Sequence, residues 1–232
     1  MSQINWAGTP EGSRDLLFGE CQCRRDYESK IASVFLRNGY SEVMTPTLEY
    51  YDTVVQSGNP IAQEAMIKLV DRDGKILVMR PDNTTPIARL ICTRLKHLQQ
   101  PFRLYYSQPV YRSDASHKGA EAQRWQVGLE LVGLEAETAD KEILNLINET
   151  LAACGISDAH IELGHADKGA IGPTTPLNYY TGLIFDVYIQ GVGTPIITGG
   201  RYDTLLSKFG RDLPAVGFAV DLEALAEVCG HE

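Results

Sequence analysis

The chain has 232 residues, a length typical of one large domain or of one domain with an appendage, and enough to bury a sizeable core. Its 30 Asp and Glu residues outnumber its 21 Lys and Arg residues, which gives a formal charge of −9. Most nucleic-acid binders need a positive surface to displace counterions from phosphates, so this charge disfavours extensive binding to tRNA or DNA. The overall charge is still compatible with a local basic groove. The hydrophobic fraction of 44% and the charged fraction of 22% exclude a disordered chain and a coiled coil.

Membrane, secretory and metal-binding classes are also disfavoured. No apolar run approaches the roughly 20 residues that span a bilayer, and segment 1–15 lacks the basic and apolar regions of a signal peptide. Cys21 and Cys23 are too close together for the usual zinc site, and no second Cys/His pair lies at ligand spacing. We therefore expect reduced thiols, a cytoplasmic protein, and neither a metal nor another cofactor.

The first half of the chain combines helical patterns with a hairpin. The expected elements are a helix over 17–37, a strand edge or end within 42–55, a hairpin with strands at 67–70 and 76–79, and a helix over 86–98. Asn38 and Gly39 are expected to end the first helix, because both tolerate a left-handed backbone. Pro46 restricts its segment to the edge or the end of a strand.

The second half alternates strand signals with two helices. The expected elements are strands over 102–106, 125–134, 160–163, 182–188 and 195–198, and helices over 138–153 and 222–228. Thr138 is the expected N-cap of its helix, whose apolar stripe is formed by Ile143, Leu144, Ile147 and Leu151. Hairpins outnumber alternating βα units, so the sequence predicts an α+β fold in which helices flank an antiparallel sheet.

Four polar or glycine-rich clusters are candidates for a binding site. They are Arg80-Pro-Asp-Asn-Thr-Thr85, Val110-Tyr-Arg-Ser-Asp114 with Gln126-Val-Gly-Leu-Glu130, Asn178-Tyr-Tyr-Thr-Gly182, and Gly199-Gly-Arg-Tyr-Asp203 with Pro214-Ala-Val-Gly-Phe218. The first lies where a strand gives way to a helix, which suits either the polar end of a small ligand or a plain capping turn. In the second, Gln126 and Glu130 share one strand face and, with Arg112, suit an ammonium and a carboxylate together; a solvent-facing sheet is the alternative. None of the glycine-rich turns forms a phosphate loop.

In this order, the motifs resemble the catalytic core of histidyl-tRNA synthetase. They resemble more closely that enzyme's non-synthetase relative, the regulatory subunit of short-form ATP phosphoribosyltransferase. The matching motifs are Thr9-Pro-Glu-Gly-Ser-Arg-Asp15, Arg80-Pro-Asp-Asn-Thr84, Tyr111-Arg112, Gln126-Val-Gly-Leu-Glu130, Tyr179-Tyr180, Gly199-Gly-Arg-Tyr-Asp203 and Gly217-Phe-Ala219. The resemblance implies one class II aminoacyl-tRNA synthetase-like domain over 1–232, with an antiparallel sheet flanked by helices, which dimerises through the segment that holds Pro46.

Cationic groups distinguish the two relatives. Adenylate formation must stabilise a charged phosphate transition state, which requires fixed cations. Thr175 and Ala224 stand where the synthetase has arginines, and Asn178 stands where it has an aspartate. The loop that should carry further arginines reads Gly-Ala-Glu-Ala over 119–122. The resemblance to the synthetase therefore does not extend to its chemistry with ATP.

The other half of the synthetase pocket is retained. The positions that match its histidine contacts are Asp82 (in place of a glutamate), Thr84, Arg112, Gln126, Glu130, Tyr179 and Tyr180. By the same resemblance, Glu130 pairs with the α-ammonium group and Arg112 lies near the carboxylate. A site that keeps the contacts to the amino acid and lacks those to ATP suits a histidine sensor.

The resemblance thus implies a non-catalytic regulatory subunit in histidine biosynthesis. Its implied partners are the catalytic subunit of ATP phosphoribosyltransferase, a second copy of this chain and histidine, but neither tRNA nor a membrane. Two alternatives remain: a core fragment of histidyl-tRNA synthetase, and a free-standing histidine-sensing module. Both relatives carry a long helical insertion where this chain has only residues 166–177, and no anticodon-binding domain is expected here.

Overall fold

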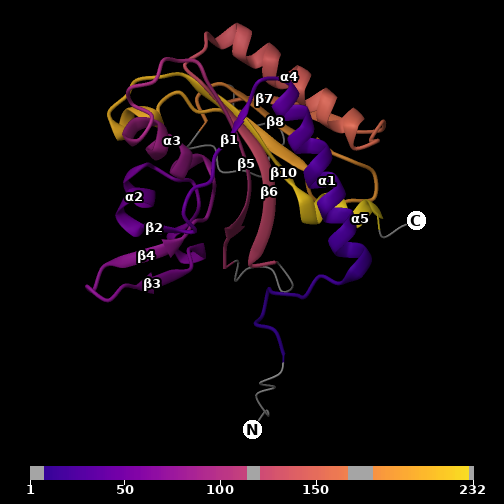
Figure 1. Cartoon of the computed structure of the whole chain (residues 1–232), viewed down its shortest axis with the longest axis horizontal. Helices are drawn as coiled ribbons and strands as arrows, with labels where there is room; N and C mark the ends of the chain where they lie inside the picture. Colours follow the sequence, from indigo (N-terminus) through magenta and orange to yellow (C-terminus); the bar gives the residue numbers. More distant parts are fainter. Residues whose placement is uncertain (1–7, 114–120, 167–179, 230–232) are drawn as a thin grey trace.

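A seven-stranded sheet organises the computed structural model, which describes residues 8–113, 121–166 and 180–229, with side chains described as far as residue 226 (Figure 1). Within these residues the strand order is β1-β5-β6-β10-β9-β8-β7, and all neighbours are antiparallel except β1 and β5. The strands of this sheet are β1 (Ser41–Glu42), β5 (Phe102–Tyr111), β6 (Gln123–Val132), β7 (His160–His165), β8 (Leu183–Tyr188), β9 (Ile197–Arg201) and β10 (Ala215–Asp221). The α+β class with an antiparallel sheet is confirmed.

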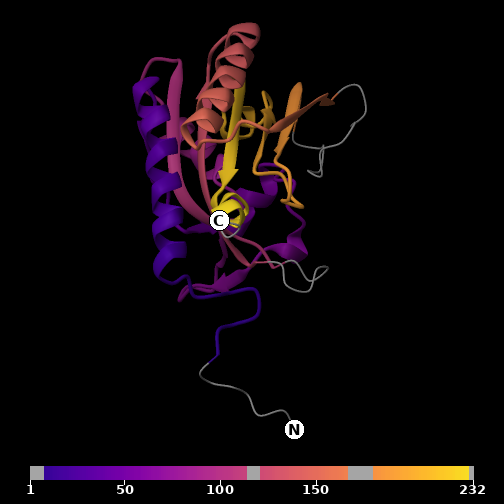
Figure 2. The ribbon, with the colours of Figure 1, turned by 90° about the vertical axis from the view of Figure 1, so that its right-hand side faces the viewer.

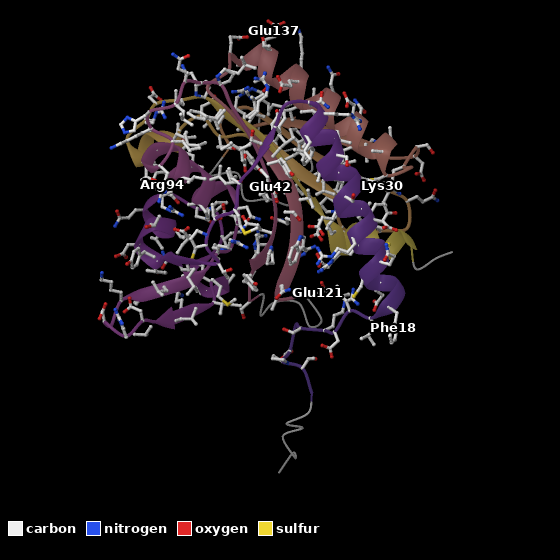
Figure 3. The ribbon with its side chains drawn as sticks, viewed as in Figure 1. Phe18, Lys30, Glu42, Arg94, Glu121 and Glu137 are labelled. Carbon is white, nitrogen blue, oxygen red and sulfur yellow. The ribbon has the colours of Figure 1, made fainter. Side chains whose placement is uncertain are left out.

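Three helices cover one face of this sheet. They are α1 (Phe18–Arg37), α4 (Ala136–Ala153) and α5 (Leu222–Cys229). Their apolar side chains pack with those of β6, β8 and β10 in the larger core, in which Ile31, Ile143 and Leu129 are fully buried. Figure 2 shows α1 alongside the strands β5 and β6. The outer sides of these helices are polar, as the exposed side chains of Lys30 and Glu137 illustrate (Figure 3). This face of the sheet is therefore covered by the hydrophobic core.

The opposite face is only partly covered, and this leaves room for a site. A second core joins α3 (Thr84–Thr93) and the 3₁₀ helix η4 (Leu206–Phe209) to β5 and β6, with Ile87, Tyr106 and Leu206 buried in it. A small separate sheet of order β2-β4-β3 lies beyond α3 (Figure 1). It comprises β2 (Leu48–Tyr50), β3 (Lys68–Val70) and β4 (Ile76–Met79), and neighbours α2 (Tyr51–Gln56) and the 3₁₀ helix η1 (Gln63–Ala65).

Most of the predicted elements are present, with shifted ends. The long first helix and the hairpin of β3 and β4 are confirmed. Helix α3 begins at Thr84 and ends at Thr93, so it is shorter than the predicted span of 86–98. Thr138 does not cap α4; the carboxylate of Glu135 accepts hydrogen bonds from the backbone N–H groups of Glu137 and Thr138.

Helix α2 and strand β10 had not been predicted. The segment with Pro46 contains the short helix α2 after its strand. Strand β10 begins within residues 214–218, which had been grouped with the glycine-rich turns. It is instead a central strand, paired with β6 on one side and β9 on the other.

The cysteines differ in part from expectation. Cys23 is disulfide-bonded, so the prediction of reduced thiols is wrong for this residue, whereas Cys21, Cys92 and Cys154 are free. None of the helices in the described part of the chain is both long and apolar enough to cross a membrane.

Candidate functional site

A cavity of about 300 Å³ lies on the partly covered face of the large sheet. Its wall combines the start of α3 with β5, β6, β9 and β10. The lining residues are Pro60, Ile61, Asp82, Asn83, Thr84, Tyr106, Arg112, Arg124, Gln126, Tyr180, Thr194, Pro195, Ile196, Thr198, Gly199, Tyr202, Gly217, Phe218, Ala219 and Asp221.

Small residues of β9 and β10 form the floor of the cavity: Gly199, Gly217 and Ala219. Gly128 of β6 lies opposite Tyr106 of β5 and opposite Ala219 of β10, and Glu130 of β6 lies opposite Gly217. A Cβ atom at residue 217 would collide with Oε2 of Glu130 and with the carbonyl oxygen of Leu129. Larger side chains here would fill the cavity or push Glu130 aside, so the glycines preserve the site.

The start of α3 brings a carboxylate to the cavity wall. Asp82 Oδ1 accepts a hydrogen bond from the backbone N–H of Thr85 at 2.7 Å, as expected of a side chain at a helix N-terminus. The amide of Asn59 donates to Asp82 and to Thr85 Oγ1. Burial raises the pKa of Asp82, and its hydrogen bonds and the charge of Arg112 oppose that rise. The segment is thus a capping turn, and Asp82 also lines the cavity; its role in holding the polar end of a ligand stays a prediction.

Arg112 provides a cationic group on the same wall. Its Nε donates to the carbonyl oxygen of Pro81 at 2.8 Å, which fixes the guanidinium beside Asp82. Burial lowers the pKa of Arg112, and the Asp82 charge opposes this effect. An ammonium group and a carboxylate group of one small ligand could therefore be held by neighbouring side chains of opposite charge.

Glu130 lies behind the wall rather than on it. Its side chain is 2% exposed, and it is not among the described residues that line the cavity. Thr84 Oγ1 donates to its Oε1 at 2.7 Å and the hydroxyl of Tyr202 donates to its Oε2, and both of these partners do line the cavity. Burial raises the pKa of Glu130 to about 8. A carboxyl with this pKa is largely protonated at pH 7.

The other predicted site residues fall into two groups. Gln126 and Tyr180 line the cavity, and Gln126 shares the face of β6 with Glu130 as predicted. Burial and nearby carboxylates raise the pKa of Tyr180, so its phenol stays protonated. Tyr179 lies outside the described residues, as do Thr175 and Asn178.

The cavity wall carries a second charged pair. Arg124 Nη2 lies 2.7 Å from Asp221 Oδ2, and both side chains line the wall. Ala224, which stands where a nucleotide-clamping arginine had been sought, is 2% exposed and packs in the larger core. Among the described residues, no group of three or more His, Cys, Asp or Glu side chains could hold a metal ion.

Asn59 and Tyr202 are parts of the site that the sequence analysis did not assign. Asn59 follows Ser57 and Gly58 in a stretch without periodicity, so no local signal marks it. Tyr202 belongs to the Gly-Gly-Arg-Tyr-Asp motif, and this motif was the available signal. Its contact with Glu130 joins residues 72 positions apart in the sequence, so only the fold reveals it.

Comparison with known proteins places this geometry in a family. The model of the histidyl-tRNA synthetase family matches residues 12–168 and 172–225. An ATP phosphoribosyltransferase regulatory subunit of Clostridium novyi (strain NT) is 28% identical in an alignment of 317 positions, which covers 94% of this chain and 75% of that protein.

Solved structures point to the same family and fold. A crystal structure titled as an ATP phosphoribosyltransferase regulatory subunit/histidyl-tRNA synthetase from Bacillus halodurans C has a TM-score of 0.87 and 26% identity, covering 97% of this chain and 84% of that one. Apo histidyl-tRNA synthetase of S. aureus has a TM-score of 0.78 at 22% identity, over 96% of this chain and 70% of that one, which shows the shared class II fold. With its fold and most of its chain matched, the protein belongs to the histidyl-tRNA synthetase family and is similar within it to the regulatory subunits of ATP phosphoribosyltransferase.

Proposed function

We propose that this chain is a non-catalytic regulatory subunit of ATP phosphoribosyltransferase that binds histidine in the cavity. It would assemble with the catalytic subunit in the first step of histidine biosynthesis and relay feedback by histidine. The observation that carries this proposal is the composition of the cavity. Asp82, Thr84, Arg112, Gln126 and Tyr180 converge on one wall, whereas Ala224 stands in the core at the position of the nucleotide-clamping arginine.

An amino acid fits the charges of this wall. Asp82 supplies an acceptor for an ammonium group, and Arg112 supplies donors for a carboxylate group. Glu130 adds a second acidic group behind Thr84 and Tyr202. The positive charge of a ligand bound in the cavity would act on this group electrostatically. We propose that Glu130 becomes ionised when the ammonium group of the ligand arrives.

Activation of the catalytic subunit tests the proposal directly. The purified chain is mixed with the catalytic subunit, and the formation of phosphoribosyl-ATP from ATP and phosphoribosyl pyrophosphate is measured with and without histidine. We expect activation, co-elution of the two chains and inhibition by histidine. Absence of both activation and co-elution would refute the assignment.

The alternative function is that of a histidyl-tRNA synthetase core. The similar B. halodurans structure is described by both names, regulatory subunit and histidyl-tRNA synthetase. Histidine-dependent ATP–pyrophosphate exchange separates the two functions, because only the synthetase core should catalyse it. A pull-down from lysate would separate a free-standing sensor from the regulatory subunit by identifying the partner.

We also propose a homodimer, based on the open face of the small sheet. Pairing of β2 and β3 with β4 places five apolar side chains on that face: Leu48, Tyr50, Leu69, Leu77 and Met79. The side chains of Leu48, Tyr50 and Leu69 are 40–51% exposed. An apolar sheet face of this kind is typical of an interface.

The remaining parts of the proposal concern the whole chain. We infer one synthetase-like domain in which the helical insertion of the relatives is missing between 166 and 177; the break in the family match between residues 168 and 172 supports this. The formal charge of −9 supports a protein without tRNA as a partner. A cytoplasmic location follows from the proposed place in amino-acid biosynthesis.

A further inference from the structure

The two oxygens of the Asp221 carboxylate have different partners. Oδ1 accepts the backbone N–H groups of Glu223 at 3.1 Å and of Ala224 at 3.2 Å, so it caps the start of α5. Oδ2 forms the ion pair with Arg124, at 2.7 Å from Nη2. The Asp221 side chain is only 10% exposed. The cap therefore holds this carboxylate in place beside Arg124, on the cavity wall.

The charges on the wall balance only because Asp221 is present. Among the described lining residues, the charged side chains are Asp82, Asp221, Arg112 and Arg124. The electrostatic environment of Arg112 includes repulsion from Arg124 and attraction to Asp221, so both arginines and this aspartate are close to one another. Without Asp221, two guanidinium groups would line one cavity with Asp82 as the single carboxylate among the described lining residues. Such a pair of guanidinium groups suits a phosphate or a diphosphate.

We propose that Asp221 is a built-in anion on the cavity wall that engages Arg124 and thereby excludes phosphate-bearing ligands. Asp221 is thus a specificity-determining residue: it restricts the cavity to ligands without a phosphate group. An incoming phosphate would have to displace a carboxylate that is fixed by two backbone hydrogen bonds, and it would be repelled while that carboxylate stayed. This inference concerns only the part of the cavity wall at Arg124 and Asp221, and it stands whether or not the cavity binds histidine.

Asp221→Asn gives a clean test. An asparagine keeps an oxygen for the helix cap and removes the charge that pairs with Arg124. Asp221→Ser is a second variant that also caps the helix, for use if the first is unstable. Glu223→Gln is the matched control: it removes a carboxylate two residues away, which accepts the backbone N–H of Trp125 and is absent from the cavity wall. Burial and the charge of Asp221 raise the pKa of Glu223 to about 7, so the comparison is made at pH 8, where this group is ionised.

The measurement is calorimetric titration with inorganic pyrophosphate at low ionic strength, on folded protein checked by circular dichroism. We expect the wild type and Glu223→Gln to bind pyrophosphate weakly, and Asp221→Asn to bind it at least tenfold more tightly. Adding Arg124→Gln to Asp221→Asn should abolish the gain. An equal affinity in the wild type and both capping variants would overturn the proposal. It would also be overturned by a gain that Glu223→Gln reproduces, or by one that survives the loss of Arg124.

Discussion

Thr84 Oγ1 donates a hydrogen bond to Glu130 Oε1 at 2.7 Å and so connects the start of α3 to the middle of the central strand β6. Thr84 faces the cavity, whereas Glu130 lies behind it, 2% exposed, with the Tyr202 hydroxyl on its other oxygen. The acid is therefore placed to respond to charge in the cavity without contact with bulk water. We therefore expect the proposed binding of histidine to depend on pH.

The first prediction is that binding of histidine releases a proton from Glu130. The pKa of this carboxyl is about 8, so at pH 7 it is largely protonated. An ammonium group nearby favours the ionised form and lowers that pKa. Affinity should therefore rise about five- to tenfold between pH 7 and pH 8.5 in the wild type and stay nearly constant in Glu130→Gln.

Calorimetry in two buffers of different ionisation enthalpy measures the proton directly. The wild type should release close to one proton at pH 7, and Glu130→Gln should release none and bind about ten- to a hundredfold more weakly at pH 8.5. If both proteins bound histidine equally with no difference in protons released, Glu130 would have no part in recognition.

The second prediction concerns the free energy of unfolding of the protein without added histidine. An ordinary glutamate in the unfolded chain has a pKa near 4.5, whereas that of Glu130 in the folded chain is about 8. The folded state thus binds more protons between these values, so the contribution of Glu130 to stability is full below pH 4.5 and is lost as the pH rises to 8. The free energy of unfolding should fall more from pH 5 to pH 8 in the wild type than in Glu130→Gln.

Urea denaturation at pH 5, 6.5 and 8 provides this comparison, since each unit of pKa difference corresponds to about 1.4 kcal/mol. Glu223, whose pKa is raised to about 7, is present in both proteins and cancels from the difference. Parallel pH profiles for the two proteins would contradict the raised pKa of Glu130.

Local signals explain which parts of the fold could be predicted from sequence. Helix α1 and the hairpin of β3 and β4 are encoded by periodicity and by an Asp-Gly turn within short stretches, and both were found. Strand β10 was missed because a glycine such as Gly217 is more typical of a turn than of a strand. In the fold this glycine makes room for Glu130, a residue on the neighbouring strand.

The same distinction applies to the site. Asp82 and Thr84 belong to one contiguous motif, and Gln126 belongs to another, so a motif comparison finds them. Asn59 and Tyr202 reach the site through contacts between segments far apart in the chain, which no single stretch of sequence encodes. That Glu130 lies behind the wall follows from packing, which the alternation of strand residues does not determine.

The third prediction tests the glycine on the floor of the cavity. Gly217→Ala would force a methyl group against Glu130 Oε2 and the backbone oxygen of Leu129, in a sheet where neither strand can withdraw easily. We expect a loss of about 1–3 kcal/mol in the free energy of unfolding, together with loss of histidine binding. Gly19→Ala is the control, because no heavy atom lies within 4 Å of the added Cβ and alanine is favoured in the helix α1. Equal stability of the two variants in urea denaturation would show that the floor relaxes.

The last prediction concerns the proposed dimer. Leu69 lies on the open apolar face of the small sheet, opposite Leu77, whereas the next residue, Val70, points to the other face of the same strand. Leu69→Lys would place a charge in the proposed interface and should raise the dimer dissociation constant at least tenfold, because a buried unpaired ammonium costs several kcal/mol. Val70→Lys carries the same charge on a residue that is more exposed, 73% against 40%, and should leave the dimer intact.

Light scattering coupled to size exclusion at micromolar concentration distinguishes these outcomes. A dimeric wild type, a dimeric Val70→Lys and a largely monomeric Leu69→Lys would assign the interface to this face. A monomeric wild type would refute the dimer itself. If instead both variants dissociated equally, the charge would be acting on the edge strand β3 as a whole, since the two residues share that strand and differ in the face they occupy.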